Sequence, residues 1–287
     1  MPPRSQRVPT RDGLSLHVLV WSDEGVPLVF LHGFSNEAHV WDDVAPVFAP
    51  YYRTLALDLP GHGDSDRDPA RRYDHESMAR DVASALDALG APRVVLVGHS
   101  MGGRVAMRFA GMHPERLAGL VVVDAGPELD ARGVLRIRLD AEASDPTFAS
   151  RTEAEAALRR AYPLAEPEAI ARLLRHTLRE RPDGRLEARL DPGFMEAARS
   201  LAPAERAELE RAETAALWAA LGKVACPALV VRGAASDVLS PETAERMVEA
   251  GLPRGSLAVI PRAGHSVMLD NPGAFRDALE RFALGDA

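Results

Sequence analysis

The chain has 287 residues, of which 46% are hydrophobic and 26% are charged, and its formal net charge is −8. This composition is that of a globular protein, and the acidic balance argues against a surface that binds nucleic acid. A single cysteine, Cys226, excludes an intramolecular disulfide and a cysteine-based metal site. No apolar run reaches the roughly 18 residues of a membrane span, and the first residues lack the apolar core of a signal peptide. We therefore expect a cytoplasmic protein with no membrane or nucleic-acid partner.

The first half of the chain alternates apolar, β-rich runs with helical patterns, which is typical of a parallel sheet covered by helices. The clearest helix is predicted at 74–90, where apolar residues follow helical spacing between Asp74, which can cap the start, and Gly90, which can end it. A second helix is predicted from just after Ser100 to about Met112. Strands are predicted at 14–21, 28–31, 53–58, 93–98 and 119–124.

The pattern changes at about residue 127. From there to about residue 220 the sequence has short helical patterns rich in Ala, Leu, Arg and Glu, with almost no β-branched runs. Strand patterns return at 228–233 and 256–261, and a loop and a helix follow each of them. We therefore expect one α/β core in two parts, residues 1–126 and 221–287, interrupted by a helical cap at 127–220.

The sharpest local feature is the sequence 98-GHSMG-102, which matches G-x-S-x-G and lies between a buried strand and a helix. Such a turn places the serine hydroxyl at an exposed apex. The glycines two positions away on either side let the strand and the helix pass closely. Ser100 is therefore the candidate nucleophile.

A serine hydroxyl needs a base that removes its proton, and the base needs an acid that orients it. His265 lies in a loop after the last predicted strand, and such a loop shares the carboxyl edge of the sheet with Ser100. His32 and His62 lie in turns at the same edge and are the alternatives, whereas we expect His99 to point away. We take His265 as the base.

Two aspartates could orient this histidine. Asp237 follows the penultimate strand and gives the chain order Ser, Asp, His that is known for this arrangement. Asp124 ends the strand at 119–124, and either carboxylate could reach a histidine at that edge. We prefer Asp237 because it lies in a loop, and we keep Asp124 as the alternative acid.

An oxyanion hole requires two backbone N–H groups that face the carbonyl oxygen. Met101, directly after the nucleophile, supplies one at the start of the helix. Phe34 supplies the other, because Gly33 lets the loop after the strand at 28–31 turn tightly. Several apolar residues near the site indicate either an apolar substrate pocket or ordinary core packing: Phe34, Trp41, Met101, Val238, Val267 and Met268.

These motifs resemble the α/β-hydrolase superfamily, specifically its branch that carries a cap. The resemblance rests on LHGF at 31–34, DLPGHGDSD at 58–66, VGHSMGG at 97–103 and AGHSVMLDNP at 263–272. It implies a mostly parallel eight-stranded sheet flanked by helices, a helical lid between the sixth and seventh strands, and hydrolysis without a cofactor or a metal. It also implies a triad of Ser100, Asp237 and His265, with the amides of Phe34 and Met101 as the oxyanion hole.

The departures from related subfamilies narrow the expected reaction. Epoxide hydrolases and haloalkane dehalogenases of this branch use an aspartate where this chain has Ser100. Carbon–carbon bond hydrolases often carry a tryptophan after the catalytic histidine, where this chain has Ser266. The resemblance favours an esterase, lactonase or thioesterase, monomeric or homodimeric, that acts on a small ester-type substrate. In several such enzymes the acid follows the sixth strand, which keeps Asp124 open. A carbon–carbon bond hydrolase and a ligand receptor of the same fold are the alternatives.

Overall fold

The computed structural model describes residues 2–143, 147–194, 196 and 202–285. Its centre is an eight-stranded sheet in the order β1-β2-β4-β3-β5-β6-β10-β11. The strands are β1 Arg4–Pro9, β2 Ser15–Val20, β3 Pro27–Leu31, β4 Arg53–Leu57, β5 Val94–His99, β6 Leu117–Val123, β10 Ala228–Gly233 and β11 Gly255–Ile260. The β1–β2 and β2–β4 pairs are antiparallel and the others parallel, so the predicted mostly parallel eight-stranded sheet is confirmed.

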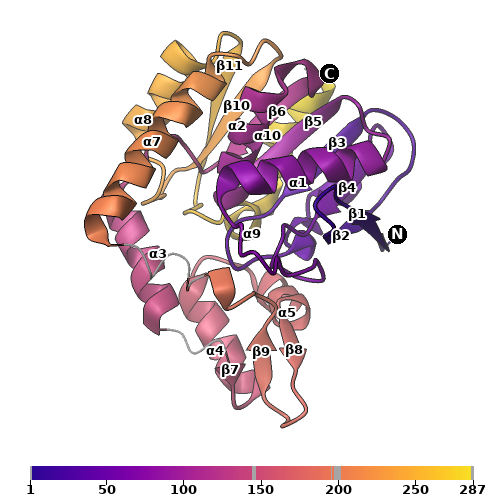
Figure 1. The fold of residues 1–287 in the computed structure, drawn as a ribbon, viewed down its shortest axis with the longest axis vertical. Coiled ribbons are helices and arrows are strands. Elements are labelled where there is room, and N and C mark those ends of the chain that lie inside the picture. The colour runs from indigo at the N-terminus through magenta and orange to yellow at the C-terminus, as the bar shows by residue number, and fades with distance from the viewer. Residues whose placement is uncertain (1, 144–146, 195, 197–201, 286–287) are drawn as a thin grey trace.

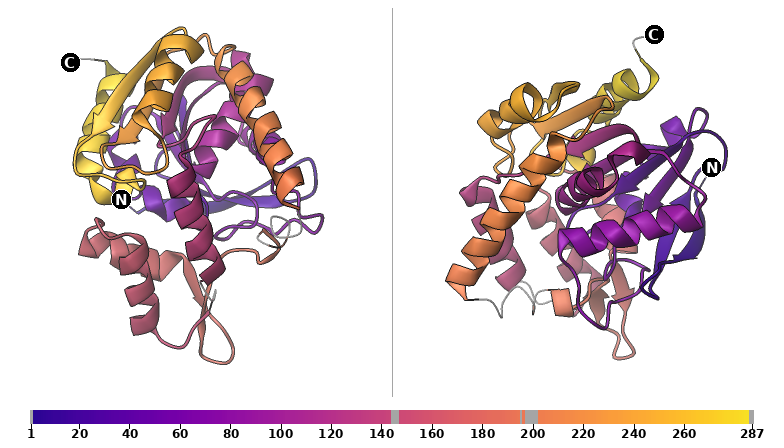
Figure 2. Two further views of the ribbon diagram at one scale, coloured as in Figure 1. Left: turned by 90° about the vertical axis from the view of Figure 1, so that its left-hand side faces the viewer. Right: turned by 45° about the horizontal axis from the view of Figure 1, so that its top comes forward.

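Helices cover both faces of the sheet (Figures 1 and 2). One face packs against α1 His75–Ala88, α2 Met101–Met112, α7 Pro203–Leu221 and α8 Pro241–Arg246. The other face packs against the short helices Ala38–Trp41 and Ala45–Phe48, and against α9 Val267–Asp270 and α10 Pro272–Leu284. In β5, Leu96 packs into the first layer and Val97 into the second, which explains why this strand reads as a continuous apolar run.

Helix α1 shows how closely local signals match the structure. The Asp74 carboxylate accepts a hydrogen bond from the Ser77 N–H at 2.8 Å and so caps the helix as expected. Gly90, just beyond the end of the helix, has φ +63°, a conformation that favours glycine.

The first strand was not predicted. β1 pairs along its whole length with β2, although most of its side chains are exposed and only Val8 is buried. Backbone hydrogen bonds to β2 hold this strand in the sheet. Because most of its side chains face solvent, its sequence has no apolar alternation that would predict a strand.

The segment between β6 and β10 contains more than helices. In the described residues it holds α3 Ala131–Ala143, β7 Thr147–Phe148, α4 Arg151–Ala161, α5 Pro167–His176, β8 Leu178–Glu180, β9 Leu186–Ala188 and α7. Strands β7, β9 and β8 form a small antiparallel sheet that the sequence did not predict.

We refer to residues 127–220 as the inserted segment. Its elements from α4 to β9 project from the large sheet in Figure 1, whereas α7 packs against α2. Two backbone hydrogen bonds connect the segment to the loop after β4. The Asp191 N–H donates to the Gly61 carbonyl at 2.8 Å, and the Gly63 N–H donates to the Arg189 carbonyl at 2.9 Å. None of the helices in the described residues combines the length and the apolar run that a bilayer crossing requires.

Candidate active site

Ser100 lies on the turn between β5 and α2, where its backbone has φ 52° and ψ −117°. A positive φ is uncommon outside glycine, and backbone strain of this kind clusters at functional sites. A Cβ on Gly98 would lie 2.2 Å from the carbonyl oxygen of Gly102, and one on Gly102 would lie 2.5 Å from that of His32. The predicted need for glycine on both sides of the turn is confirmed.

His265 follows β11, and its imidazole contacts the Ser100 side chain. Its Nε2 lies 2.9 Å from Ser100 Oγ, and its Nδ1 lies 2.9 Å from Asp124 Oδ1. If Nδ1 carries the proton and donates to Asp124, Nε2 is free to accept the proton of the serine hydroxyl. The alternatives His32 and His62 instead bond to backbone atoms of the loop after β4.

Asp124 comes directly after β6 and is fully buried, with φ +45°. Its Oδ1 accepts hydrogen bonds from His265 and from the Ser236 hydroxyl at 2.5 Å, and its Oδ2 accepts from the Gly233 N–H at 2.8 Å. Three donors therefore surround a carboxylate that has no contact with solvent. Such partners compensate the burial of a charge and fix its orientation.

The choice of Asp237 as the residue beside His265 is corrected by this geometry. The Asp237 carboxylate faces the inserted segment and forms a bidentate ion pair with Arg136 of α3, at 2.7 and 2.8 Å. That guanidinium lowers the pKa of the Asp237 carboxyl below its usual value. Asp124, the alternative, occupies the position next to the histidine.

The two amides predicted for the oxyanion hole lie on segments that pack against the nucleophile. Met101 begins α2, so its N–H has no acceptor within the helix. A Cβ on Gly33 would lie 3.1 Å from Ser100 Cβ, which places the loop that carries Phe34 directly against the serine. Within the described residues, neither N–H donates to another residue. Both are therefore available to a ligand.

Most of the residues considered for an apolar pocket lie in the core instead. Trp41 is fully buried against Phe30 and Phe275, and Val267 is fully buried in the same layer. Val238 is 1% exposed. Of the two alternatives left open by the sequence, core packing therefore describes Trp41, Val238 and Val267 in this structure.

A sequence profile described as the alpha/beta hydrolase fold matches residues 26–272. The chain belongs to the α/β-hydrolase fold family. This α/β hydrolase is 30% identical over 270 residues to an esterase of Mycobacterium tuberculosis, an alignment that covers 91% of this chain and 83% of the relative. It is 28% identical over 259 residues to a putative 2-succinyl-6-hydroxy-2,4-cyclohexadiene-1-carboxylate synthase of Bacillus subtilis, with 89% of both chains covered. Among solved structures, E-2-(acetamidomethylene)succinate hydrolase superposes with a TM-score of 0.84, 26% identity and 98% coverage of both chains.

His99 contacts the histidine loop of this hydrolase, a role that the sequence did not indicate. Its Nε2–H donates to the backbone carbonyl of His265 at 2.8 Å, and the two imidazole rings lie 4.8 Å apart. Burial and the nearby His265 hold the pKa of His99 well below its usual value. His99 is therefore a neutral donor at ordinary pH. Its position next to Ser100 was the one available signal.

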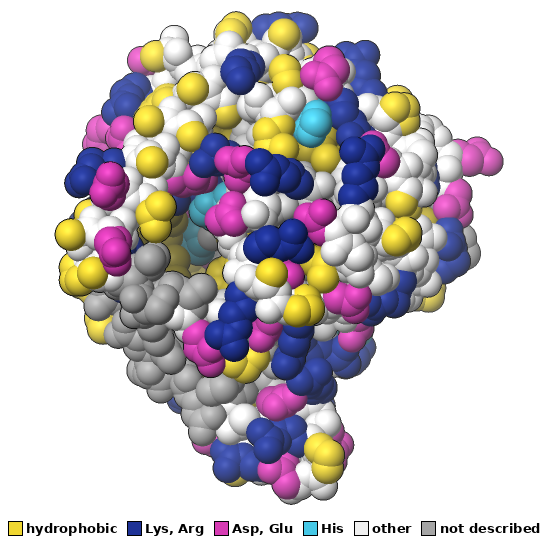
Figure 3. Space-filling view, in the orientation of Figure 1, with side chains coloured by type: hydrophobic (Ala, Val, Ile, Leu, Met, Phe, Trp, Pro, Cys, Tyr) yellow, Lys and Arg dark blue, Asp and Glu magenta, His cyan; other side chains and the backbone are white. Residues whose placement is uncertain are grey.

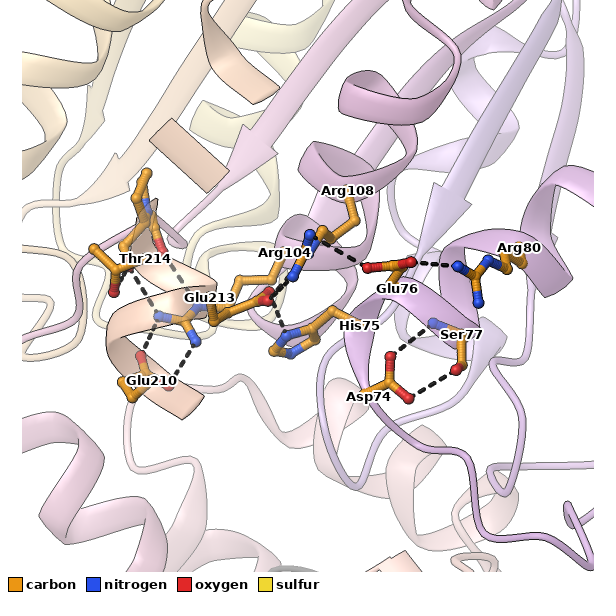
Figure 4. A network of polar contacts seen from close by, with 12 residues as sticks. Asp74, His75, Glu76, Ser77, Arg80, Arg104, Arg108, Glu210, Glu213 and Thr214 are labelled. Carbon is orange, nitrogen blue, oxygen red and sulfur yellow. Dashed lines mark hydrogen bonds and ion pairs between the residues drawn. The ribbon is translucent and has the colours of Figure 1, made fainter. Parts of the chain in front are cut away.

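A polar network around the buried guanidinium of Arg104 connects α2 with the chain that leaves Asp124 (Figure 4). Arg104, one turn beyond Ser100, donates to the carbonyls of Gly126 and Pro127 at 3.2 and 3.1 Å and pairs with Glu210 of α7 at 2.7 Å. One guanidinium thus connects the nucleophile helix, the segment after the acid and α7.

The same network continues toward α1 through Glu213. Its carboxylate accepts hydrogen bonds from His75 at 2.9 Å and from Arg108 at 3.0 Å. Burial raises the pKa of Glu213, but these hydrogen bonds outweigh that effect and lower the pKa to about 2.

Within the described residues, one group could present three donors to a metal ion: His39, Asp42 and His176, whose ligand atoms lie within 4.8 Å of one another. The two imidazoles are stacked, with centroids 3.7 Å apart and planes 24° apart. Because the lone pairs lie in the ring planes, rings stacked in this way do not direct them at one ion.

A hollow opens on the face shown in Figure 3, with histidine and apolar side chains on its wall.

Proposed function

We propose that this α/β hydrolase cleaves a carboxylic ester-type bond, in an ester, lactone or thioester, through an acyl-enzyme on Ser100. The observation that carries the proposal is the hydrogen-bonded chain from Ser100 Oγ through His265 to Asp124, with 2.9 Å at each step. This is the geometry of a nucleophile, a general base and an orienting acid.

In the first step, His265 Nε2 takes the hydroxyl proton while Ser100 Oγ attacks the carbonyl carbon. The amides of Phe34 and Met101 donate to the oxygen that becomes negatively charged, and Asp124 stabilises the imidazolium. The leaving alcohol or thiol departs with the proton from His265. Water then attacks the acyl-enzyme, His265 again accepts a proton, and the acid is released as Ser100 is regenerated.

The inserted segment, residues 127–220, acts in this proposal as the lid that selects the substrate. Its contacts with the loop after β4 support this role, as does the position of Phe194. The Phe194 ring lies 5.3 Å from that of Phe34, whose amide belongs to the proposed oxyanion hole. These aromatic rings favour a small substrate with apolar character.

The similarity to an esterase, which covers 91% of this chain and 83% of the relative, supports the same reaction class. A second candidate is hydrolysis of a succinate derivative, because the structure of E-2-(acetamidomethylene)succinate hydrolase matches over 98% of the chain at 26% identity. A substrate panel of short-chain aryl esters, lactones, thioesters and (acetamidomethylene)succinate distinguishes the two.

The test combines a fluorophosphonate probe with steady-state kinetics on p-nitrophenyl butyrate. We expect one probe molecule per chain at Ser100, rapid turnover, and loss of both in Ser100→Ala. Stoichiometric labelling with negligible turnover on every member of the panel would instead favour a ligand receptor on this fold. Unchanged turnover in Ser100→Ala would refute the serine mechanism.

A further inference from the structure

Asp237 lies beside the site without contacting the histidine, and its contacts lead into the inserted segment. Its carboxylate forms a bidentate ion pair with Arg136 of α3. The two side chains are 38% and 43% exposed, and ion pairs of this exposure contribute little to overall stability. The position of the pair, next to the loop that supports Asp124, therefore points to a local role.

Helix α3 packs on the same loop through its backbone. A Cβ on Gly133 would lie 2.2 Å from the carbonyl oxygen of Asp237 and 2.8 Å from Val238 Cγ2. At the start of α3, the Asp130 N–H donates to the Val238 carbonyl at 2.8 Å. The first turns of α3 thus pack directly on residues 237–238, and the ion pair between Arg136 and Asp237 adds a side-chain contact to this packing.

The opposite side of this loop supports the acid. Ser236 donates its hydroxyl hydrogen bond to Asp124 Oδ1, the atom that also accepts from His265. The same Ser236 oxygen accepts from the N–H groups of Val238 and Leu239, at 3.1 and 3.3 Å. A shift of residues 237–238 would therefore move the Ser236 hydroxyl.

The buried Arg232 makes this loop a compact unit. Its guanidinium donates to the carbonyls of Ala234, Ser236 and Leu239, at 3.3, 3.1 and 2.7 Å. The loop is therefore expected to move as one body rather than to absorb a displacement of α3 locally.

We propose that Asp237 and Arg136 are positioning residues: by fixing α3 to residues 236–238, their ion pair holds the Ser236 hydroxyl on Asp124 and so aligns His265. The inference rests on the proposed serine mechanism. It makes full alignment of the acid depend on the docked position of α3. The inserted segment thereby contributes to the chemical step as well as to substrate selection.

The first test measures kcat and KM on p-nitrophenyl butyrate at one fixed pH on the plateau of the pH profile. Asp237→Asn and Arg136→Gln are each expected to lower kcat roughly three- to tenfold with little change in KM, the size of effect typical of coupled neighbours. Asp237→Glu, which keeps the carboxylate, should retain most of the activity. The control is Arg246→Gln, which removes a similarly exposed bidentate pair with Glu128 and should leave kcat unchanged.

The second test examines the route through Ser236. Ser236→Ala should lower kcat by a similar or larger factor, and adding Asp237→Asn to it should cause no further loss, since both changes act on the same hydroxyl. Losses that multiply in the double variant would overturn the proposed route. Values of kcat within twofold of the wild type in Asp237→Asn and Arg136→Gln would overturn the inference as a whole.

The pH dependence of kcat in Arg136→Gln distinguishes poorer alignment of Asp124 from the mere loss of the Arg136 charge. Removing the positive charge of Arg136 would, by electrostatics alone, favour the imidazolium and move the acidic limb of the kcat profile to higher pH. Poorer alignment of Asp124 destabilises the imidazolium and moves the limb to lower pH, which is the expected result. An upward shift contradicts the inference. Ser100→Ala is measured in parallel: activity there refutes the serine mechanism and this inference together, whereas an inactive Ser100→Ala with unaffected Asp237→Asn refutes this inference alone.

Discussion

The carboxylate of Asp124 meets the imidazole of His265 at 2.9 Å, although 141 residues separate them in the chain. Asp124 directly follows β6 and His265 follows β11, and β10 lies between these two strands in the sheet. The contact therefore crosses the end of β10. This is possible because β10 ends in Gly233, where a Cβ would lie 2.0 Å from the carbonyl oxygen of Gly264.

We expect the two aspartates to differ strongly in their effect on catalysis. Asp124→Asn should lower kcat by about 10⁴, the factor known for the corresponding change in a serine protease. Asp237→Asn should lower it by no more than about tenfold, because its carboxylate pairs with Arg136. Steady-state kinetics of both variants decides this, and equal losses, or a larger loss for Asp237→Asn, would rule out the acid assignment.

Gly233→Ala should displace the loop that carries His265. Its new Cβ meets two backbone carbonyls, those of Ala263 and Gly264, and backbone cannot move aside as a flexible side chain can. We expect kcat to fall by at least about 10², since small displacements of catalytic groups have effects of that size. Gly273→Ala is the matched control, because the nearest atom to its Cβ would be 4.0 Å away. Similar kcat values for the two variants would contradict this account.

His99 is expected to support His265 by hydrogen bonding. His99→Leu removes the donor to the His265 carbonyl and should lower kcat by roughly tenfold, the cost of leaving one buried acceptor unpaired. His99→Gln keeps an N–H donor at a similar distance from the backbone and should recover part of that loss. Thermal unfolding of both variants serves as the folding control. No difference in kcat between Leu and Gln would show that packing, not the hydrogen bond, matters at this position.

Glu213 should make the stability of the protein depend on pH. Its pKa is lowered to about 2 in the folded state, so its contribution is complete above the ordinary carboxyl pKa of about 4.3 and is lost as the pH falls toward 2. Glu213→Gln should therefore lower the Tm by several degrees at pH 6. The difference from the wild type should shrink as the pH is lowered from about 4.5 to 3, as followed by circular dichroism. Glu115→Gln, at an exposed residue, should show no such trend.

The sequence by itself determined most of the secondary structure, the family and two residues of the candidate site. Capping by Asp74, the parallel strands and the Ser100 turn depend on neighbouring residues, so their signals lie in short segments of the chain. His265 could be found because its loop follows the last strand.

The choice between Asp124 and Asp237 was decided only by the tertiary structure. Both residues follow parallel strands, and no local pattern shows which carboxylate faces the histidine and which faces α3. The same holds for His99, whose partner His265 is distant in sequence. Local signals describe how a segment folds, whereas a hydrogen bond between side chains requires the position of both segments, which only the packed sheet and the inserted segment set.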